Sequence, residues 1–497
     1  MSATRLLDAL AAQGERLVLS DACQQLSAAE VLRKVQALTA NFANAQVIAV
    51  LADNSANWVL ADLATLTMGA VHLPLPTFFS PEQMVNALTQ TQADAVYTDQ
   101  PERITALNLG FVCEWTQDSH SFLRRPVAPH NLPQACCKVS FTSGSTGAPK
   151  GVCLSASGLM ATAQAVQSSL APLDIQRHLV VLPLSLLLEN TAGIYAALLN
   201  GSPVHVPPLA SLGWRGMAGF DPAALQHMAF NVQPSSMILV PELLKAWLLF
   251  LQLTQQRAPQ SLRFVAVGGA HVDAAFISQA RQAGIPAYEG YGLTECGSVV
   301  SLNLPGDEST GVGRVLPHVQ LRLSQGEVLL QTSAFLGYTG QTPPPETTRP
   351  AAATHEFATG DLGTLDAQGH LHLMGRSKNL LITSFGRNIS PEWVESVLLA
   401  QPALLQAVVL GDARPWLVAV LAPMPGMTES HITAAMAYAN RQLPDYAQVK
   451  HWLIAPPMTL ANGLATGNGR PKRSAIAEQF ASRLETLYNP PADHPTP

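Results

Sequence analysis

Short apolar runs alternate with amphipathic segments over the first hundred residues, and this alternation constrains the fold more than any other feature. A capping box at Ser27–Glu30 predicts a helix that continues to about Phe42. Alternation of strands and helices predicts parallel strands with helices on the faces of a sheet. The segments that follow the first helix are a strand at Val47–Leu51, a helix at Asn54–Met68, a strand at Val71–Leu75, a helix from Ser80 and a strand at Ala93–Thr98.

The alternation continues further along the chain and then changes character. Short alternating strands between Gly311 and Leu373 predict a small β-rich subdomain, and the chain from about Leu380 predicts a separate α+β domain. The fold class is therefore α/β, with a large N-terminal part of parallel-sheet layers and a smaller C-terminal part. The further strands expected in the large part are Leu179–Leu184, Pro203–Val206, Met237–Val240, Phe264–Val267 and Ala287–Glu289.

The segment Ser140–Val152 reads SFTSGSTGAPKGV and predicts a phosphate-binding loop. Its glycines tolerate positive φ, so backbone N–H groups and hydroxyls can converge on phosphate oxygens, and Lys150 adds a positive charge. The loop does not fit the Walker pattern, because no Ser or Thr follows the lysine. A P-loop NTPase is therefore disfavoured.

The overall charge and the cysteines exclude several other classes. The chain has 28 basic and 34 acidic residues, for a net charge of −6, which argues against nucleic-acid binding. The six cysteines show no metal-ligand spacing and predict free thiols in a reducing compartment. The N-terminus shows no signal peptide, and the most apolar window, Met237–Leu253, is too short for a membrane span. We therefore expect a cytoplasmic enzyme with no integral membrane segment.

Three later motifs carry further candidate chemistry. Tyr288–Ser298, with the sequence YEGYGLTECGS, offers an aromatic face, a hydroxyl and a carboxylate suited to Mg²⁺. Thr359–Gly363 places an aspartate in a glycine-flanked turn, and Gly375–Lys378 follows with two basic residues. Near the C-terminus, Asn468–Arg473 is a cluster of basic residues.

Together these motifs resemble those of the adenylate-forming (ANL) superfamily of AMP-binding enzymes. The resemblance extends from about Leu26 to about Ile476, with the motifs in the family's order and spacing. Two stretches resemble the long-chain acyl-CoA synthetase and fatty acyl-AMP ligase branch in particular: LPLSLLLENTAG at Leu182–Gly193 and KNLLITSFGRNISPEWVE at Lys378–Glu395.

The resemblance implies a role for each matching residue. Lys150 and Thr294 would act on the phosphates, Glu295 would hold Mg²⁺, Asp361 would bind the ribose, and Arg376 would reach the ribose or the phosphate. A hinge near Lys378 would separate an N-terminal ATP- and acyl-binding domain, 1–377, from a mobile C-terminal lid domain, 378–497. The remaining nucleotide-binding residues would be Thr142, Ser143, Gly144, Ser145, Thr146, Gly147, Gly269, Ala270, Glu289, Gly290, Tyr291 and Gly292.

Two positions depart from the family pattern. Leu186 stands where the long-chain branch expects a histidine, although Glu189 retains the glutamate that follows. Arg470 stands where the family has a catalytic lysine, and Lys472 lies two residues further on. Arginine neutralises phosphate charge bidentately but is not interchangeable with an ammonium group. Either Arg470 or Lys472 would take the role, and the sequence leaves the choice open.

The resemblance implies ATP- and Mg²⁺-dependent activation of a carboxylic acid, expected to be a fatty acid, with release of pyrophosphate. The acyl group would pass to the pantetheine thiol of coenzyme A or of an acyl carrier protein, and these two acceptors are not distinguished. Two alternatives stay open: a catalytically impaired homologue that binds nucleotide and acyl group, and an adenylate-forming enzyme with a different acceptor.

Overall fold

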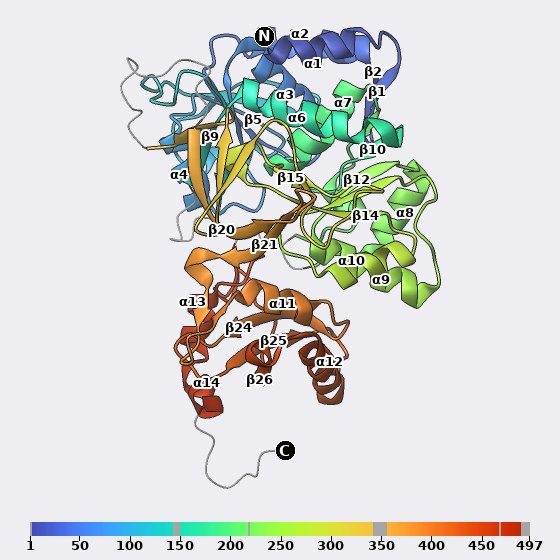
Figure 1. Cartoon of the computed structure of the whole chain (residues 1–497). Helices are drawn as coiled ribbons and strands as arrows, with labels where there is room; N and C mark the ends of the chain where they lie inside the picture. Colours follow the sequence, from blue (N-terminus) through green and yellow to red (C-terminus); the bar gives the residue numbers. More distant parts are fainter. Residues whose placement is uncertain (1, 143–149, 217–218, 341–354, 467–468, 489–497) are drawn as a thin grey trace. The chain divides into compact units, whose positions relative to one another are not determined.

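The structure, a computed structural model, describes residues 2–142, 150–216, 219–340, 355–466 and 469–488. The chain divides into two compact units (Figure 1). The first unit comprises Met1–Gly269, Ala280–Leu321 and Leu330–Phe357, and the second comprises Ala270–Gln279, Arg322–Leu329 and Ala358–Pro497. The predicted α/β class, with a large N-terminal part and a smaller C-terminal part, is confirmed.

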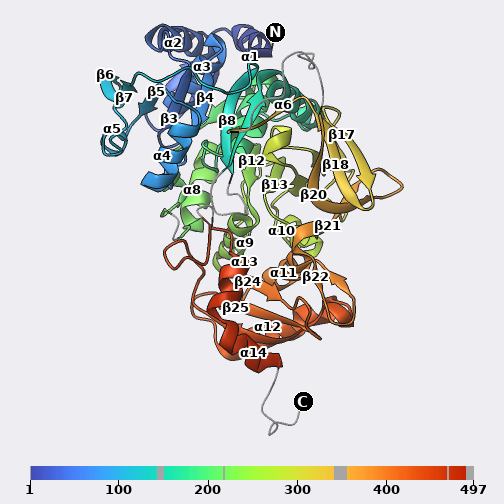
Figure 2. The same ribbon diagram turned by 90° about the vertical axis from the view of Figure 1, so that its left-hand side faces the viewer.

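An eight-stranded sheet in the first unit contains the predicted strands of the first hundred residues (Figure 2). β3 is parallel to both β4 and β5, and all five of its residues are buried, as its unbroken VIAVL sequence requires. β4 is also parallel to β8, whereas the pairs β8–β9, β9–β19, β5–β7 and β6–β7 are antiparallel, so the sheet is mixed. Its order is β19 (Phe335–Tyr338), β9 (Lys150–Ser155), β8 (Cys136–Thr142), β4 (Val71–Pro74), β3 (Val47–Leu51), β5 (Ala95–Thr98), β7 (His120–Arg124) and β6 (Val112–Gln117).

A nine-stranded sheet contains the later predicted strands, which are parallel from β1 to β14. The expected strand Leu179–Leu184 is wrong in length: β10 covers only His178–Leu179, because side chains from other segments hold the residues after Val180. The order is β16 (Arg314–Val315), β15 (Ser301–Leu302), β14 (Ala287–Tyr291), β13 (Phe264–Val267), β12 (Ser236–Leu239), β10, β11 (Val204–His205), β1 (Leu17–Ser20) and β2 (Gln25–Ser27).

Helices cover these sheets where the sequence places their caps. The amide of Glu30 donates to Ser27 Oγ and the amide of Ser27 donates to Glu30 Oε2, which completes the predicted capping box. The helix that follows packs against α3, and both contribute to one apolar core around Trp58. The helices of the first unit are α1 (Ser2–Ala11), α2 (Ala28–Asn41), α3 (Ala56–Met68), α4 (Pro81–Gln90), α5 (Pro101–Thr105), α6 (Ala156–Leu170), α7 (Ala196–Asn200), α8 (Pro222–Val232) and α9 (Pro241–Thr254). Most of α10 (Ala274–Gln282) belongs to the second unit.

A buried polar cluster lies inside the first unit. Asp62 on α3 is 1% exposed; its Oδ1 lies 2.8 Å from Lys138 Nζ, and its Oδ2 accepts hydrogen bonds from Asn190 and Tyr195. Lys138 holds the pKa of Asp62 at about 2 against the opposing effect of burial. Asn190 and Tyr195 belong to a π-helix, Glu189–Tyr195, that joins directly to α7. The cluster therefore fixes a rare helical form in place.

The second unit contains a three-stranded sheet with helices on both faces. Val409, Ala419 and Leu421 face a core shared with α11 (Pro391–Leu399) and α12 (Glu429–Gln442). Alternate residues of the same strands, Val418 and Val420, face a core shared with α13 (Arg473–Gln479) and α14 (Ala481–Tyr488). The strands are β24 (Leu404–Leu410), β25 (Leu417–Pro423) and β26 (Val449–Ile454).

The predicted β-rich region is a separate four-stranded sheet. Its strands are β17 (Gln320–Ser324), β18 (Glu327–Thr332), β20 (His355–Leu365) and β21 (Leu371–Arg376), and a short hairpin of β22 (Leu381–Ile382) and β23 (Asn388–Ile389) follows.

Candidate active site

The phosphate-binding segment connects two antiparallel strands. Thr142 ends β8, Lys150 begins β9, and these two residues lie opposite each other in the sheet. Walker loops lead from a strand into a helix, so this hairpin arrangement agrees with the absence of the Walker sequence. The predicted contacts Ser143, Gly144, Ser145, Thr146 and Gly147 lie outside the described residues.

The YGLTE motif forms a tight turn at the end of β14. Tyr291 ends the strand and is half-buried, and Thr294–Cys296 forms a single 3-10 turn. A Cβ atom on Gly292 would lie 1.7 Å from the carbonyl oxygen of Ser298, so only glycine fits there. Thr162 on α6 donates to the carbonyl oxygen of Cys296 at 3.2 Å. The turn is thus fixed at both ends.

Tyr338 connects the phosphate segment to the YGLTE turn, and the sequence motifs did not identify it. Its hydroxyl donates a hydrogen bond of 2.9 Å to Glu295 Oε1, and Lys150 Nζ lies 5.9 Å from the centre of its ring. Burial, reinforced by the Glu295 carboxylate, raises the pKa of Tyr338, so the hydroxyl stays protonated. The structure therefore brings Lys150 and Glu295 together around one aromatic side chain.

The strand ends beside this turn lack side chains that would crowd a ligand. A Cβ on Gly268 would lie 3.4 Å from the carbonyl oxygen of Gly290, and Gly269 adopts a φ of +89°. Glu289 is buried on β14. Gly268 and Gly269 thus follow β13 without side chains, next to Gly290 of β14.

Asp361 and Arg376 lie opposite each other on β20 and β21 in the second unit. Arg376 Nε lies 2.9 Å from Asp361 Oδ1; the aspartate is buried and the arginine is about half exposed. The amide of Gly360 donates to Glu327 Oε1, which holds the turn before Asp361. Asp361, predicted to bind the ribose, and Arg376, predicted to reach the ribose or the phosphate, are thus brought together.

The basic segment near the C-terminus is a short turn fixed by its neighbours. Arg470 and Lys472 are both exposed, and the amide of Arg470 donates to Thr466 Oγ1. Arg473, next in the chain, donates to Glu395 Oε1 at 2.5 Å and to the carbonyl oxygen of Val409 at 3.2 Å. Arg473 anchors the turn on α11 and β24, and the two candidate cations extend from it.

Two side chains from elsewhere in the first unit and the segment's own glutamate hold the backbone at and just before the LPLSLLLENTAG segment. Asn54 donates to the carbonyl oxygen of Leu182 and accepts from the amide of Leu184. Trp214 donates to the carbonyl oxygen of Val181. Glu189 is fully buried; it accepts from the amide of Leu182 and lies 2.7 Å from His178 Nε2. The glutamate retained from the family pattern therefore shapes the backbone of this apolar segment.

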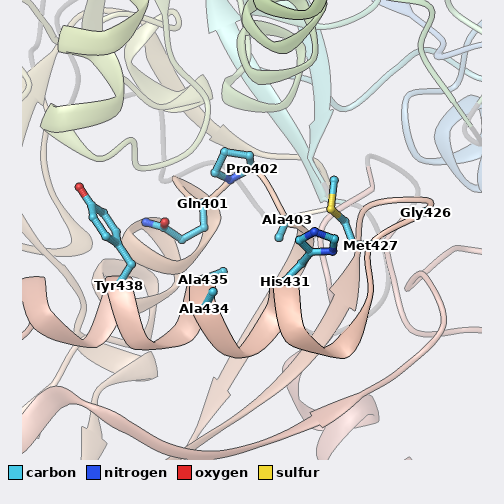
Figure 3. A pocket seen from close by; sticks show the side chains of 9 residues that line it. All are labelled: Gln401, Pro402, Ala403, Gly426, Met427, His431, Ala434, Ala435 and Tyr438. Carbon is cyan, nitrogen blue, oxygen red and sulfur yellow. The ribbon is translucent and has the colours of Figure 1, made fainter.

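A separate pocket in the second unit contains none of the predicted site residues. Figure 3 shows His431 and Tyr438 on α12 facing the loop Gln401–Ala403. The pocket has a volume of about 450 Å³, and we assign it no ligand.

The chemistry of the site fits a metal ion that arrives with its substrate. Among the residues the structure describes, no group of three or more His, Cys, Asp or Glu is arranged to hold a metal ion. Mg²⁺ is commonly bound by one or two carboxylates together with substrate phosphates and water. The single carboxylate of Glu295, close to Lys150, fits that pattern. Within the same described part of the chain, no helix is long and apolar enough to cross a membrane.

Comparison with known proteins identifies the family. Residues 6–329 match the model of the AMP-binding enzyme family, and residues 378–491 match that of the AMP-binding enzyme C-terminal domain. The chain therefore belongs to the AMP-binding enzymes of the adenylate-forming superfamily, which use ATP with Mg²⁺.

Its relatives are AMP-forming acid–CoA ligases. It is 27% identical to the long-chain-fatty-acid–CoA ligase FadD15 of Mycobacterium bovis, with 87% of this chain and 86% of the relative covered. It is also 27% identical to the 2-succinylbenzoate–CoA ligase of Bacillus mycoides, with 74% and 76% covered. The O-succinylbenzoate coenzyme A synthetase of Bacillus subtilis, solved with ATP and a magnesium ion, shares the fold with a TM-score of 0.71 at 21% identity, covering 95% of this chain and 98% of that one.

Proposed function

We propose that this enzyme activates a fatty acid with ATP, forms an acyl-adenylate with release of pyrophosphate, and transfers the acyl group to a pantetheine thiol. The observation that carries the proposal is the arrangement of Lys150 and Glu295 around Tyr338. Tyr338 contacts both a lysine, which suits phosphate oxygens, and a carboxylate, which suits Mg²⁺, and this supports the proposal.

The first step needs no general base. A free carboxylic acid titrates near pH ~4–5, so the substrate is already a carboxylate at neutral pH. A carboxylate oxygen attacks the α-phosphorus of ATP, the bond to the bridging oxygen breaks, and pyrophosphate leaves with its electron pair. Lys150 and Thr294 stabilise the phosphate charge, so catalysis is mainly positioning and charge neutralisation. Mg²⁺ held by Glu295 would add further charge neutralisation on the phosphate oxygens.

Other residues bind the nucleotide in this proposal. Tyr291 stacks on the adenine beside the strand ends at Gly269 and Gly290. Asp361 accepts from the ribose hydroxyls, because an ionised carboxylate is an acceptor with two oxygens. Its ion pair with Arg376 fixes the orientation of that carboxylate. Arg470 is the stronger candidate for the lysine position, and Lys472 is the alternative.

The second step transfers the acyl group. The pantetheine thiol attacks the acyl carbonyl, AMP leaves, and a thioester forms. We propose that domain 378–497 turns about a hinge near Lys378 relative to domain 1–377 between the two steps. Lys378 is exposed and lies in a single turn, Ser377–Asn379, between β21 and β22, and this position between two strands supports the hinge.

The apolar segment Leu184–Leu188 supports an aliphatic substrate, as does the similarity to a long-chain-fatty-acid–CoA ligase. Leu186, in place of a histidine, removes a polar group from this segment. An aromatic acid is the second candidate, because several relatives are 2-succinylbenzoate–CoA ligases.

Product analysis tests the proposal directly. Purified enzyme is incubated with ATP, Mg²⁺ and one acid at a time, with either coenzyme A or a pantetheine-loaded carrier protein, and products are identified by mass spectrometry. We expect an acyl thioester with a fatty acid and one of the two thiols. ATP binding with neither AMP nor thioester formed would favour a binding protein without catalysis. AMP formation with an ester or amide product would indicate a different acceptor.

A further inference from the structure

Tyr338 contacts both charged groups of the proposed phosphate site, Lys150 and Glu295. It donates from its hydroxyl to Glu295 Oε1 at 2.9 Å, and its ring lies beneath Lys150 Nζ. No sequence motif that we identified includes Tyr338, and the hydrogen bond joins residues 43 positions apart. Its role therefore has to be inferred from the structure.

The position of Tyr338 is fixed by the sheet. It ends β19, which pairs antiparallel with β9, and it lies opposite Val152. The next residue, Thr339, donates its amide to the carbonyl oxygen of Gly151 at 2.8 Å. The Tyr338 ring packs edge-on against Phe335, with centroids 5.0 Å apart. The backbone and the ring are thus held before any ligand binds.

The hydrogen bond from Tyr338 to one carboxylate oxygen of Glu295 also orients the second oxygen. The Glu295 side chain is only partly buried, and an unrestrained glutamate samples several rotamers. A hydrogen bond to Oε1 limits that freedom, and Oε2 would then be the oxygen available to a metal ion. Partners that hold metal ligands in this way typically change metal affinity by about 10–100-fold when they are removed.

We propose that Tyr338 is a positioning residue that orients Glu295 toward the Mg²⁺ of MgATP while its ring supports Lys150. This inference rests on the proposed function, because it assumes that Glu295 is the metal ligand. It goes beyond that function by assigning the orientation of Glu295 to a residue outside the phosphate and YGLTE motifs.

The test is Mn²⁺ binding, measured by electron paramagnetic resonance in the presence of a non-hydrolysable ATP analogue. Tyr338→Phe keeps the ring packing and removes the hydroxyl. We expect it to weaken Mn²⁺ binding by about 10–100-fold and to leave binding of the metal-free analogue unchanged. Tyr438→Phe is the matched control, because Tyr438 is 50% exposed on α12, and it should change neither value.

A double-mutant comparison separates positioning from packing. In a Glu295→Gln background, adding Tyr338→Phe should not weaken Mn²⁺ binding further, even if the variant unfolds at a lower temperature. An equal loss in both backgrounds would show that Tyr338 acts through packing and would overturn the inference. Mn²⁺ affinity in Tyr338→Phe within twofold of the wild type, or tighter, would also overturn it.

The outcome is independent of turnover. If the wild type binds Mn²⁺ with the analogue but adenylates no acid, the proposed function fails while the Mn²⁺ measurement still decides the role of Tyr338. If Glu295→Gln leaves Mn²⁺ affinity unchanged, Glu295 is not the ligand and the inference falls with it.

Discussion

The buried pair Asp62–Lys138 allows a quantitative prediction for Lys138→Met. Both side chains are at most 3% exposed, and their charged atoms lie 2.8 Å apart. Methionine keeps the length of the side chain and removes the charge. Removal of one partner from a buried ion pair leaves the other charge uncompensated and costs about 3–5 kcal/mol. Asp62 would keep its hydrogen bonds from Asn190 and Tyr195, so we expect the lower end, about 3 kcal/mol.

Hydrogen exchange measured by mass spectrometry reports this loss of stability peptide by peptide. A loss of about 3 kcal/mol corresponds to about 100-fold faster exchange in peptides from α3 and β8, because about 1.4 kcal/mol is a factor of ten. Arg33→Met is the control, since its ion pair with Glu30 lies at the surface at 4.0 Å and should contribute less than about 1 kcal/mol. Adding Asp62→Asn to Lys138→Met should recover part of the loss. Unchanged exchange in Lys138→Met, or a double variant less stable than the single one, would refute the reasoning.

Three further predictions follow from the structure. Gly292→Ala should reduce the rate of ATP–pyrophosphate exchange by about 100-fold. The added methyl group would lie 1.7 Å from the Ser298 carbonyl oxygen and would displace the turn. A near-normal exchange rate would show that the turn adapts. Burial lowers the pKa of His72 to about 3, whereas the same side chain has a pKa near 6.5 in the unfolded chain. The free energy of unfolding should therefore fall as the pH drops from 6.5 toward 3. Unfolding curves of His72→Asn, measured over the same pH range, should show a shallower fall. Arg470→Ala should slow adenylation by about 10–100-fold in single-turnover assays, and this loss should exceed that of Lys472→Ala. A larger loss in Lys472→Ala would give the phosphate role to Lys472.

Elements with local signals were predicted correctly from sequence. The capping box at Ser27, the apolar run Val47–Leu51 and the helix start at Pro391 each depend on residues close together in the chain. The shortened strand at His178–Leu179 and the π-helix Glu189–Tyr195 were not predicted. Both depend on distant side chains, such as Asn54 and Asp62, which lie more than 120 residues away in the chain.

Some features of the candidate site could likewise be predicted from local sequence, and others could not. The YGLTE turn and the pairing of Asp361 with Arg376 follow sequence motifs whose residues are close together in the chain or meet across one hairpin. Tyr338 carries no such signal, because its position beside Glu295 results from the pairing of β19 with β9. Fold topology, rather than local pattern, brings it to the site.

The most direct test of the central claim is ATP–pyrophosphate exchange with purified wild-type protein, over a panel of short to long fatty acids, aromatic acids and amino acids. We expect Mg²⁺-dependent exchange with a fatty acid, and we expect Glu295→Gln to abolish it. Exchange only with aromatic acids would keep adenylation and replace the fatty acid as substrate. No exchange with any acid, in a protein that still binds ATP, would show that the protein does not form an acyl-adenylate.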